Sequence, residues 1–222
     1  MLTKTEKSFS LLFLCVLIAE LICSNVVSLF QWHYITKPAI LIILIIFFLK
    51  QREHLDHFTR KIALFALVFS LLGDILLMFV NTSSNFFIGG LVAFLIAHIM
   101  YILVFLKNRN TSKVAIPFII VILILASILF YVLKDGLGGM LIPVVIYMFA
   151  ILTMLTAAFL RQGCVPKHSF IFVFIGAILF LISDSLLALN KFHEPLPFSN
   201  ISIMFTYAIA QIFIVFGVLK QR

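Results

Sequence analysis

Long apolar runs follow one another along almost the whole chain, separated by short polar stretches. A helix of about 20 apolar residues crosses a bilayer core about 30 Å thick, and it satisfies its own backbone hydrogen bonds there. With 64% apolar residues, 11% charged residues and a mean hydropathy of +1.26, these runs indicate an integral membrane protein. We predict an all-α fold, a polytopic bundle of eight transmembrane helices forming one membrane domain over residues 1–222. The expected spans are approximately 9–30, 37–49, 62–80, 86–106, 114–133, 137–160, 169–189 and 198–219.

The positive charges support this count of spans. Eight alternating crossings put all of the 16 Lys and Arg on one side except Lys37, Lys134 and Lys191. Positive residues accumulate on the cytoplasmic side of short loops, so we expect both termini to be cytoplasmic, in a plasma membrane of bacterial type. The net charge of +8 is then explained by basic loops that face anionic lipid. We expect membrane lipids and no nucleic acid as partners, and the sequence leaves the oligomeric state open.

Two aspartates, Asp74 and Asp184, interrupt the apolar runs. An ionised carboxylate at the bilayer centre costs roughly 2.5 to 3.5 kcal/mol on the mildest insertion scale, so both residues indicate function. Their surroundings match, since residues 72–78 (LGDILLM) lie over residues 182–188 (ISDSLLA), four spans later. This predicts a parallel four-plus-four repeat and one site for both acids, although short Leu-rich segments can also resemble one another by chance.

Other polar side chains fall at similar depths. At a rise of about 1.5 Å per residue, the two aspartates lie at the midplane or slightly beyond it, and Glu20, His98, Tyr147 and Tyr207 lie within several ångströms of the centre. Helical spacing gives polar stripes that we expect to face the bundle interior: Ser70 with Asp74 and Asn81, His98 with Tyr101, and Tyr207 with Gln211. The candidate catalytic residues are Asp74 and Asp184. The candidate substrate-binding or supporting residues are Lys37, His98, Tyr101, Tyr147, Ser183, Tyr207, Gln211 and Glu20.

Each candidate also has a structural alternative. Tyr and Gln inside spans often form hydrogen bonds between helices, and the aspartates could pair with Lys37, His98 or a backbone donor. Glu20 is either a structural group or a third acid. Lys37, which with Pro38 is expected to open the second helix, can snorkel to the surface or turn towards a lipid phosphate. The three cysteines lack CxxC spacing and no nucleotide, flavin or metal motif is present, so we expect no cofactor and no metal.

Together, these segments resemble the YhhN family of eight-span membrane proteins, whose animal members are lysoplasmalogenases. The resemblance covers most of the chain and implies that Asp74 and Asp184 are the catalytic pair. It is carried by residues 36–38 (TKP), 70–78 (SLLGDILLM), 90–94 (GLVAF), 97–101 (AHIMY) and 176–185 (GAILFLISDS), and by Tyr207 with Gln211.

The resemblance implies hydrolysis of the vinyl ether bond of a lysophospholipid substrate, giving a fatty aldehyde and glycerophosphocholine or glycerophosphoethanolamine. Protonation of the β-carbon limits the rate of this reaction and yields an oxocarbenium ion that water captures, so an acid and then a base are needed. Two nearby buried carboxyls resist ionising together, so one can stay protonated while the other stays charged. The alternative is a proton-coupled transporter of lipids or small molecules, because intramembrane carboxylates with His and Tyr also suit that function. A purely structural membrane protein would leave the two aspartates without a use.

Overall fold

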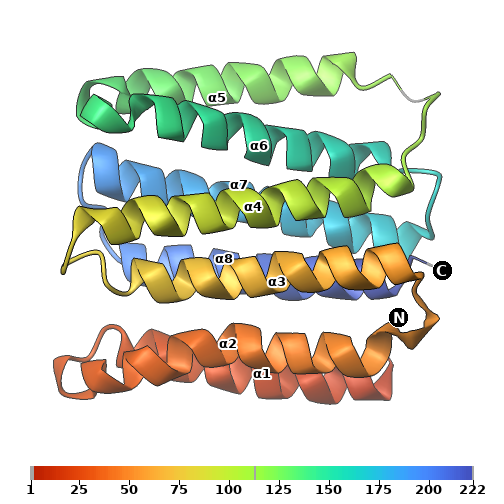
Figure 1. Cartoon of the computed structure of the whole chain (residues 1–222), viewed down its shortest axis with the longest axis horizontal. Helices are drawn as coiled ribbons and strands as arrows, with labels where there is room; N and C mark the ends of the chain where they lie inside the picture. The colour runs from red at the N-terminus through yellow and green to blue at the C-terminus, as the bar shows by residue number, and fades with distance from the viewer. Residues whose placement is uncertain (1–2, 113, 222) are drawn as a thin grey trace. The chain divides into compact units, whose positions relative to one another are not determined.

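The computed structural model describes residues 3–112 and 114–221, and within them the chain is helical, as the sequence predicts (Figure 1). Long α-helices are joined by short turns, three of which contain a 3-10 helix. The α-helices are α1 (Lys4–Cys23), α2 (Phe30–Gln51), α3 (His57–Leu77), α4 (Ser84–Lys107), α5 (Ile116–Leu137), α6 (Leu141–Leu160), α7 (Lys167–Phe192) and α8 (Ser199–Leu219). The 3-10 helices are η1 (Val27–Leu29), η2 (Arg52–His54) and η3 (Gly138–Met140).

Five helical stretches of the described chain are long and apolar enough to cross a membrane. One of them contains both α5 and α6. Helices α1 and α3 are not among the five, because each carries more than two charged side chains, among them Lys7 and Glu20 in α1 and Arg60 and Asp74 in α3. The protein is therefore a multi-pass membrane protein, while the count of eight spans and the four-plus-four repeat remain predictions. The five stretches are Val27–His54, Ser84–Lys107, Ile116–Leu160, Lys167–Phe192 and Ser199–Leu219.

Helix α2 is longer than its expected span. It begins at Phe30 rather than at residue 37, so Pro38 lies inside the helix instead of at its start. A proline removes one N–H donor and in a soluble helix usually causes a break or kink. In a membrane helix, neighbouring groups can satisfy the freed carbonyl, and the long apolar sequence that follows keeps the segment helical. The expectation that Lys37 and Pro38 open the second helix is therefore wrong.

Two other helices end earlier than expected. Helix α1 ends at Cys23 and α3 at Leu77, so Glu20 and Asp74 each lie one turn, about 5 Å, from the end of their helix. Both residues are thus nearer to the end of a helix than the sequence predicts for residues at the bilayer centre. Asn81 falls in the turn after α3 and does not extend the helical stripe that contains Asp74. Asp184 lies deeper in its own helix than Asp74 does, because α7 continues to Phe192.

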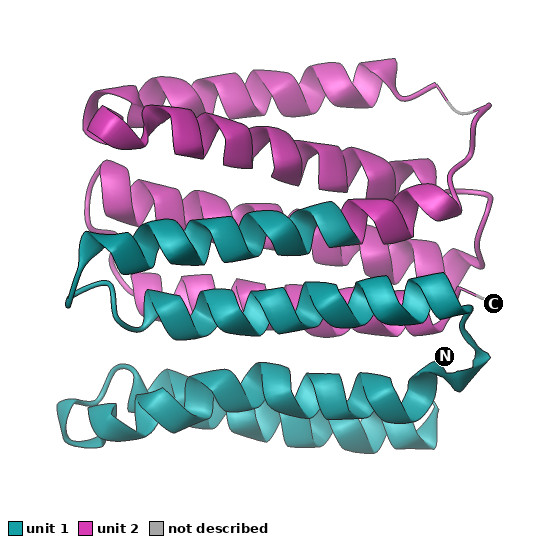
Figure 2. Cartoon of the chain, viewed as in Figure 1, with its two compact units in different colours: residues 1–100, 222 teal, residues 101–221 magenta. Residues whose placement is uncertain are grey.

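The described chain divides into two compact units (Figure 2), one that runs to residue 100 and one that covers residues 101–221. In the first unit, α2 packs against both α1 and α3. In the second unit, α7 packs against α8, α6 and α5. The boundary falls inside α4, near the middle of the chain. Asp74 belongs to the first unit and Asp184 to the second.

Helices α7 and α8 approach each other closely at two glycines. A Cβ atom on Gly217 would lie 2.7 Å from the backbone nitrogen of Val173 and 2.9 Å from the carbonyl oxygen of Ser169. A Cβ atom on Gly176 would lie 3.0 Å from the carbonyl oxygen of Ala210. Membrane helices approach this closely where small residues replace larger side chains at the interface.

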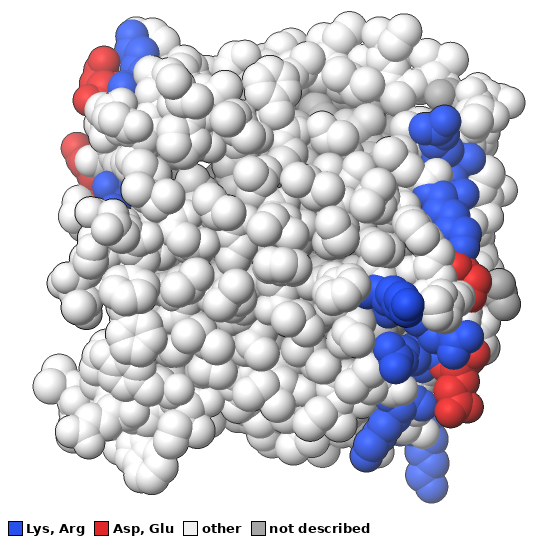
Figure 3. Space-filling model, viewed as in Figure 1, with Lys and Arg blue, Asp and Glu red and all other residues white. Residues whose placement is uncertain are grey.

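Charged side chains gather at the ends of the helices. In the first unit, basic residues lie where α1 and α3 begin and where α2 ends. In the second unit, most of them lie where α4, α6 and α8 end and where α7 begins, while Lys134 and Lys191 lie where α5 and α7 end. Figure 3 shows the blue and red atoms at helix ends, whereas the visible flanks of the helices are white. Within each unit, this distribution is typical of helices that cross a membrane; the cytoplasmic position of the termini stays a prediction.

Candidate active site

Asp74 lies on the buried face of α3 and is only 3% exposed. Ala66 and Ser70, at helical spacing before it, are buried on the same face. A Cβ atom on the neighbouring Gly73 would lie 2.6 Å from Cε2 of Phe94, so α4 approaches α3 beside the aspartate. Because Gly73 has no side chain, the ring of Phe94 can pack against α3 directly beside Asp74.

His98 follows Phe94 by one turn of α4 and is fully buried. Ser70, which belongs to the predicted polar stripe of Asp74 on α3, is also fully buried. The prediction that the stripes face the interior is thus confirmed for Ser70, Asp74 and His98, but not for Asn81, which is exposed. His98 remains a candidate for a supporting role.

Glu20 is the centre of a polar cluster that joins α1 to α2. Its carboxyl group is buried, with Oε1 2.7 Å from Nδ1 of His33, and the hydroxyl of Thr36 donates to Oε2 over 2.5 Å. A buried carboxylate is costly unless its oxygens accept hydrogen bonds, and here both do. This arrangement matches the structural alternative for Glu20. The sequence analysis did not include His33, although its position four residues before Lys37 places the two on one helix face.

Lys37 lies within α2 and is half-buried. It forms no ion pair with any residue in the described part of the chain, so the alternative of a Lys37–aspartate pair is not observed. Its position inside the helix, rather than at the start, follows from the inclusion of Pro38 in α2. Lys37 therefore remains a candidate for binding an anionic part of a ligand.

Asp184 is held by a tyrosine of the preceding helix. The hydroxyl of Tyr147, a buried residue of α6, donates to Oδ2 of Asp184 over 2.5 Å. The neighbouring Ser183 donates to the carbonyl oxygen of Ile203 in α8 over 3.0 Å. Two consecutive residues of α7 thus bond to helices on both sides. Tyr147 is a hydrogen-bonding partner between helices, as the structural alternative suggests, and its acceptor is a candidate catalytic carboxyl group.

Three other candidates form a hydrogen-bonded chain in the second unit. Tyr101 donates to Oε1 of Gln211 over 2.7 Å, and Nε2 of Gln211 donates to the hydroxyl of Tyr207 over 3.3 Å. All three residues are buried, and the ring of Tyr207 packs edge-on against Phe180. The predicted pairing of Tyr207 with Gln211 on one helix face is confirmed. These bonds agree with the interpretation that Tyr101 and Gln211 join helices.

The sequence analysis missed a buried arginine in the second unit. Arg161, directly after α6, donates through Nη2 to Ser169 over 3.0 Å and to Gln221 over 3.4 Å. Ser169 in turn donates to the carbonyl oxygen of Gly217 over 2.6 Å. Burial lowers the pKa of the guanidinium to about 10, so it stays charged at neutral pH. The negative ends of α6 and α8, both of which end here, stabilise this cation without a carboxylate.

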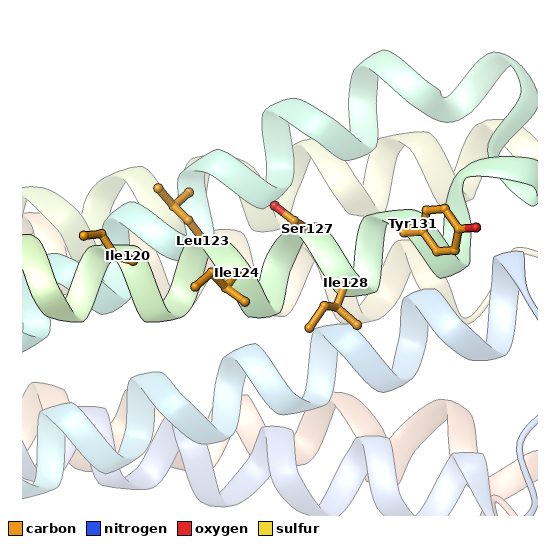
Figure 4. Close-up of a pocket in the computed structure, with 6 residues that line it drawn as sticks. All are labelled: Ile120, Leu123, Ile124, Ser127, Ile128 and Tyr131. Carbon is orange, nitrogen blue, oxygen red and sulfur yellow. The ribbon is translucent and has the colours of Figure 1, made fainter.

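The structure also contains a hollow on the outer surface of α5. It has a volume of about 500 Å³ and is lined by side chains of α5 alone, four of them aliphatic, with Ser127 and Tyr131 as the polar members (Figure 4). None of the six side chains that line it carries a carboxyl, imidazole or amino group. The hollow is therefore not a candidate for the chemistry of the two aspartates.

The chain is similar to known proteins over most of its length. A family model described as the YhhN family matches residues 32–218, which include both aspartate segments. Lysoplasmalogenase TMEM86A from Homo sapiens is 29% identical over 160 residues, which cover 70% of this chain and 64% of the relative. Lysoplasmalogenase TMEM86B from Homo sapiens is 32% identical over 158 residues, which cover 70% of this chain and 62% of the relative. The chain thus matches less than two thirds of the length of these relatives. No solved structure gives a significant match.

Proposed function

Because the chain belongs to the YhhN family, we propose that it is a membrane hydrolase of the lysoplasmalogenase type. The proposed reaction cleaves the vinyl ether bond of an alkenyl lysophospholipid to a fatty aldehyde and a glycerophosphodiester. The observation that carries the proposal is the hydrogen bond from buried Tyr147 to Asp184, because it orients a motif carboxyl group within an apolar helix. A carboxyl group that is held in place by a hydrogen bond is suited to proton transfer.

The reaction needs two proton-transfer groups. A carboxylic acid gives its proton to the β-carbon of the vinyl ether, which leaves an oxocarbenium ion. A carboxylate then takes a proton from the water that adds to this ion, and the resulting hemiacetal splits into aldehyde and alcohol. We assign the carboxylate role to Asp184, because the donor from Tyr147 stabilises a negative charge there, and the acid role to Asp74. The remaining negative charge also stabilises the oxocarbenium ion.

We also propose that all eight α-helices cross the membrane, with both termini on the cytoplasmic side. Apart from Lys37, Lys134 and Lys191, the basic residues of each unit lie at those helix ends that alternating crossings would bring to one side. The repeat of two halves has one further support. Gly73 lies against Phe94 of the following helix, and Ser183 bonds to Ile203 of the following helix, so the residue before each aspartate contacts its successor helix.

Release of fatty aldehyde from alkenyl lysophospholipid by the purified protein in detergent tests the function. The acyl lysophospholipid serves as a second substrate, and Asp74→Asn and Asp184→Asn are measured beside the wild type. Asp135→Asn is the matched control, because Asp135 is exposed near the end of α5. We expect aldehyde from the vinyl ether alone, its loss in both site variants and full activity in the control.

The result also separates hydrolysis from transport. Transport needs two compartments, whereas hydrolysis proceeds in a micelle. Absence of aldehyde from a folded wild-type sample would refute the proposed reaction, and proton-coupled lipid movement in sealed vesicles would then establish the alternative. Activity retained in both aspartate variants would remove the carboxyl pair from the mechanism.

A further inference from the structure

The inner face of α2 is apolar along most of its length and ends in two nitrogen-bearing side chains. Leu41, Leu44 and Phe48 are fully or almost fully buried. His33 and Lys37 continue the same stripe towards the start of the helix, since residues three or four apart share a face. Both side chains are half-buried. They therefore belong to the side of α2 that faces the first unit.

The opposite face of α2 is clearly different. Trp32, Ile35 and Ile42 are 58%, 60% and 44% exposed, and these apolar residues are typical of a surface that contacts lipid. Lys37 is thus not on the exposed apolar face of α2. Lys37 also has no acidic partner among the described residues, so its positive charge is available to an anionic ligand.

The imidazole of His33 is held in a fixed orientation. Its Nδ1 lies 2.7 Å from Glu20, and its ring stacks on Phe30 at 5.3 Å and contacts Tyr34 edge-on at 5.9 Å. These contacts involve Nδ1 and the imidazole ring itself. The second nitrogen, Nε2, forms no hydrogen bond with any residue of the described chain. Both oxygens of Glu20 are engaged by His33 and Thr36, so the carboxylate does not compete for an anion near Nε2.

The two side chains lie near the level of Asp74. Tyr34 stacks on Phe79 at 5.7 Å, which places the start of α2 beside the turn that follows α3. From this contact, Lys37 lies about 4.5 Å along α2 and Asp74 about 7.5 Å back along α3, and the two helices are antiparallel neighbours. Lys37 and Asp74 are therefore within one helical turn of each other in depth, with His33 about one turn beyond Lys37.

We propose that His33 and Lys37 bind the phosphate of the lysophospholipid headgroup and that Glu20 positions His33; the inference rests on the proposed function. Five single bonds join the vinyl ether oxygen to the phosphorus atom, a distance of roughly 6 Å when extended. From the level of Asp74, Lys37 lies about 3 Å and His33 about 9 Å away in depth, so a phosphate held between the two side chains suits this span. With Nδ1–H donated to Glu20 and Nε2–H donated to the phosphate, His33 would bind as an imidazolium. Free phosphate offers the same oxygen acceptors, so the experiment must separate the two sources.

The first experiment compares two substrates with the same alkenyl chain, alkenyl glycerophosphocholine and alkenylglycerol, which lacks the phosphate. His33→Asn keeps an amide near the position of Nδ1 and deletes Nε2, while Lys37→Gln deletes the charge. For each variant we expect kcat/KM to fall by roughly tenfold or more on the phosphate-bearing substrate, through KM, since each charge-assisted bond contributes at least that factor. The loss on alkenylglycerol should be much smaller. Lys134→Gln, on α5, is the matched control with unchanged kinetics on both substrates.

The second experiment measures binding without chemistry. An alkyl lysophosphocholine, which has no vinyl ether, should raise the melting temperature of the wild type, and this shift should shrink in His33→Asn and Lys37→Gln. Alkylglycerol tests the need for phosphate. Inorganic phosphate alone tests the other source, and a shift equal to that of the lipid would assign the site to a free anion instead.

The outcomes separate the two proposals. If the wild type releases no aldehyde but shows phosphate-dependent lipid binding that both variants lose, the reaction is refuted and the phosphate subsite stands. If aldehyde is released but His33→Asn and Lys37→Gln lose equal activity on both substrates, or none, the subsite is refuted and the reaction stands. His33→Gln gives a further check, because its amide nitrogen can take the place of Nε2 and should recover part of the lost affinity for the phosphate-bearing substrate.

Discussion

Replacing Gly217 by alanine would force α7 and α8 apart. The new Cβ atom would lie 2.5 Å from Cγ2 of Val173, 2.7 Å from the nitrogen of Val173 and 2.9 Å from the carbonyl oxygen of Ser169. Two of these three atoms belong to the backbone, so rotation of a side chain cannot relieve the overlap. Heavy atoms need about 3.5 Å, so the helices would have to separate by roughly 0.6 to 1 Å at this point.

The cost of this separation has two parts. Overpacking of a well-packed interior costs about 1 to 3 kcal/mol. The hydrogen bond of 2.6 Å from Ser169 to the carbonyl oxygen of Gly217 would also stretch, which adds about 1 kcal/mol. The total is about 2 to 4 kcal/mol. At roughly 2 to 4 °C per kcal/mol for a chain of this length, the melting temperature should fall by about 4 to 16 °C.

The assay is size-exclusion chromatography of detergent-solubilised protein after heating to a series of temperatures. Gly139→Ala is the matched control, because no heavy atom lies within 4 Å of a Cβ atom at that position. The control should melt close to the wild type. If Gly217→Ala melted at the same temperature as Gly139→Ala, α7 and α8 would not pack at the distance described, and the reasoning would fail.

Two further changes test contacts within the second unit. Tyr147→Phe removes only the hydroxyl that donates to Asp184, and a hydrogen bond to a charged group contributes about 1.5 to 3 kcal/mol, so aldehyde release should slow by roughly 10- to 150-fold. The exposed Tyr131→Phe should be unaffected, and equal rates for the two variants would mean that the bond plays no part in turnover. Arg161→Ala removes the donor to Ser169 and leaves a cavity, so the protein should lose about 3 kcal/mol of stability. Thermal melting beside Lys167→Ala, an exposed neighbour, measures this, and an unchanged melting temperature would contradict the role of the buried guanidinium.

The features that the sequence predicted correctly depend on composition and local spacing. Apolar runs and the pairs of polar residues at helical spacing identified an all-helical membrane protein and the interior position of His98, Tyr207 and Gln211. The motifs around Asp74 and Asp184 pointed to the family, which the family model confirms over residues 32–218. Each of these signals is contained in a segment of about one helix, so no knowledge of tertiary contacts was needed.

The features that it missed depend on contacts between helices. Pro38 carries the local signal of a helix start, yet α2 continues through it because packing and the membrane environment favour the helix. Glu20 and His33 are 13 residues apart and lie on different helices, so they meet only when α1 and α2 pack against each other. Arg161 has the sequence context of an ordinary basic loop residue, and nothing local shows that Ser169 and Gln221 enclose it. Such pairings require the fold before they can be recognised.

The aromatic residues at the start of α2 have a consequence for the lipid itself. Exposed Trp32 and the stacked pair of Tyr34 and Phe79 are of the kind that settles at the level of lipid headgroups. They would anchor the first unit at a fixed depth in the membrane. This anchor would also fix the depth of Asp74 relative to the glycerol backbones of the nearby lipids. In the proposed reaction, a change in bilayer thickness would then move the far leaflet and leave the glycerol backbones beside this anchor at the same depth relative to the carboxyl group.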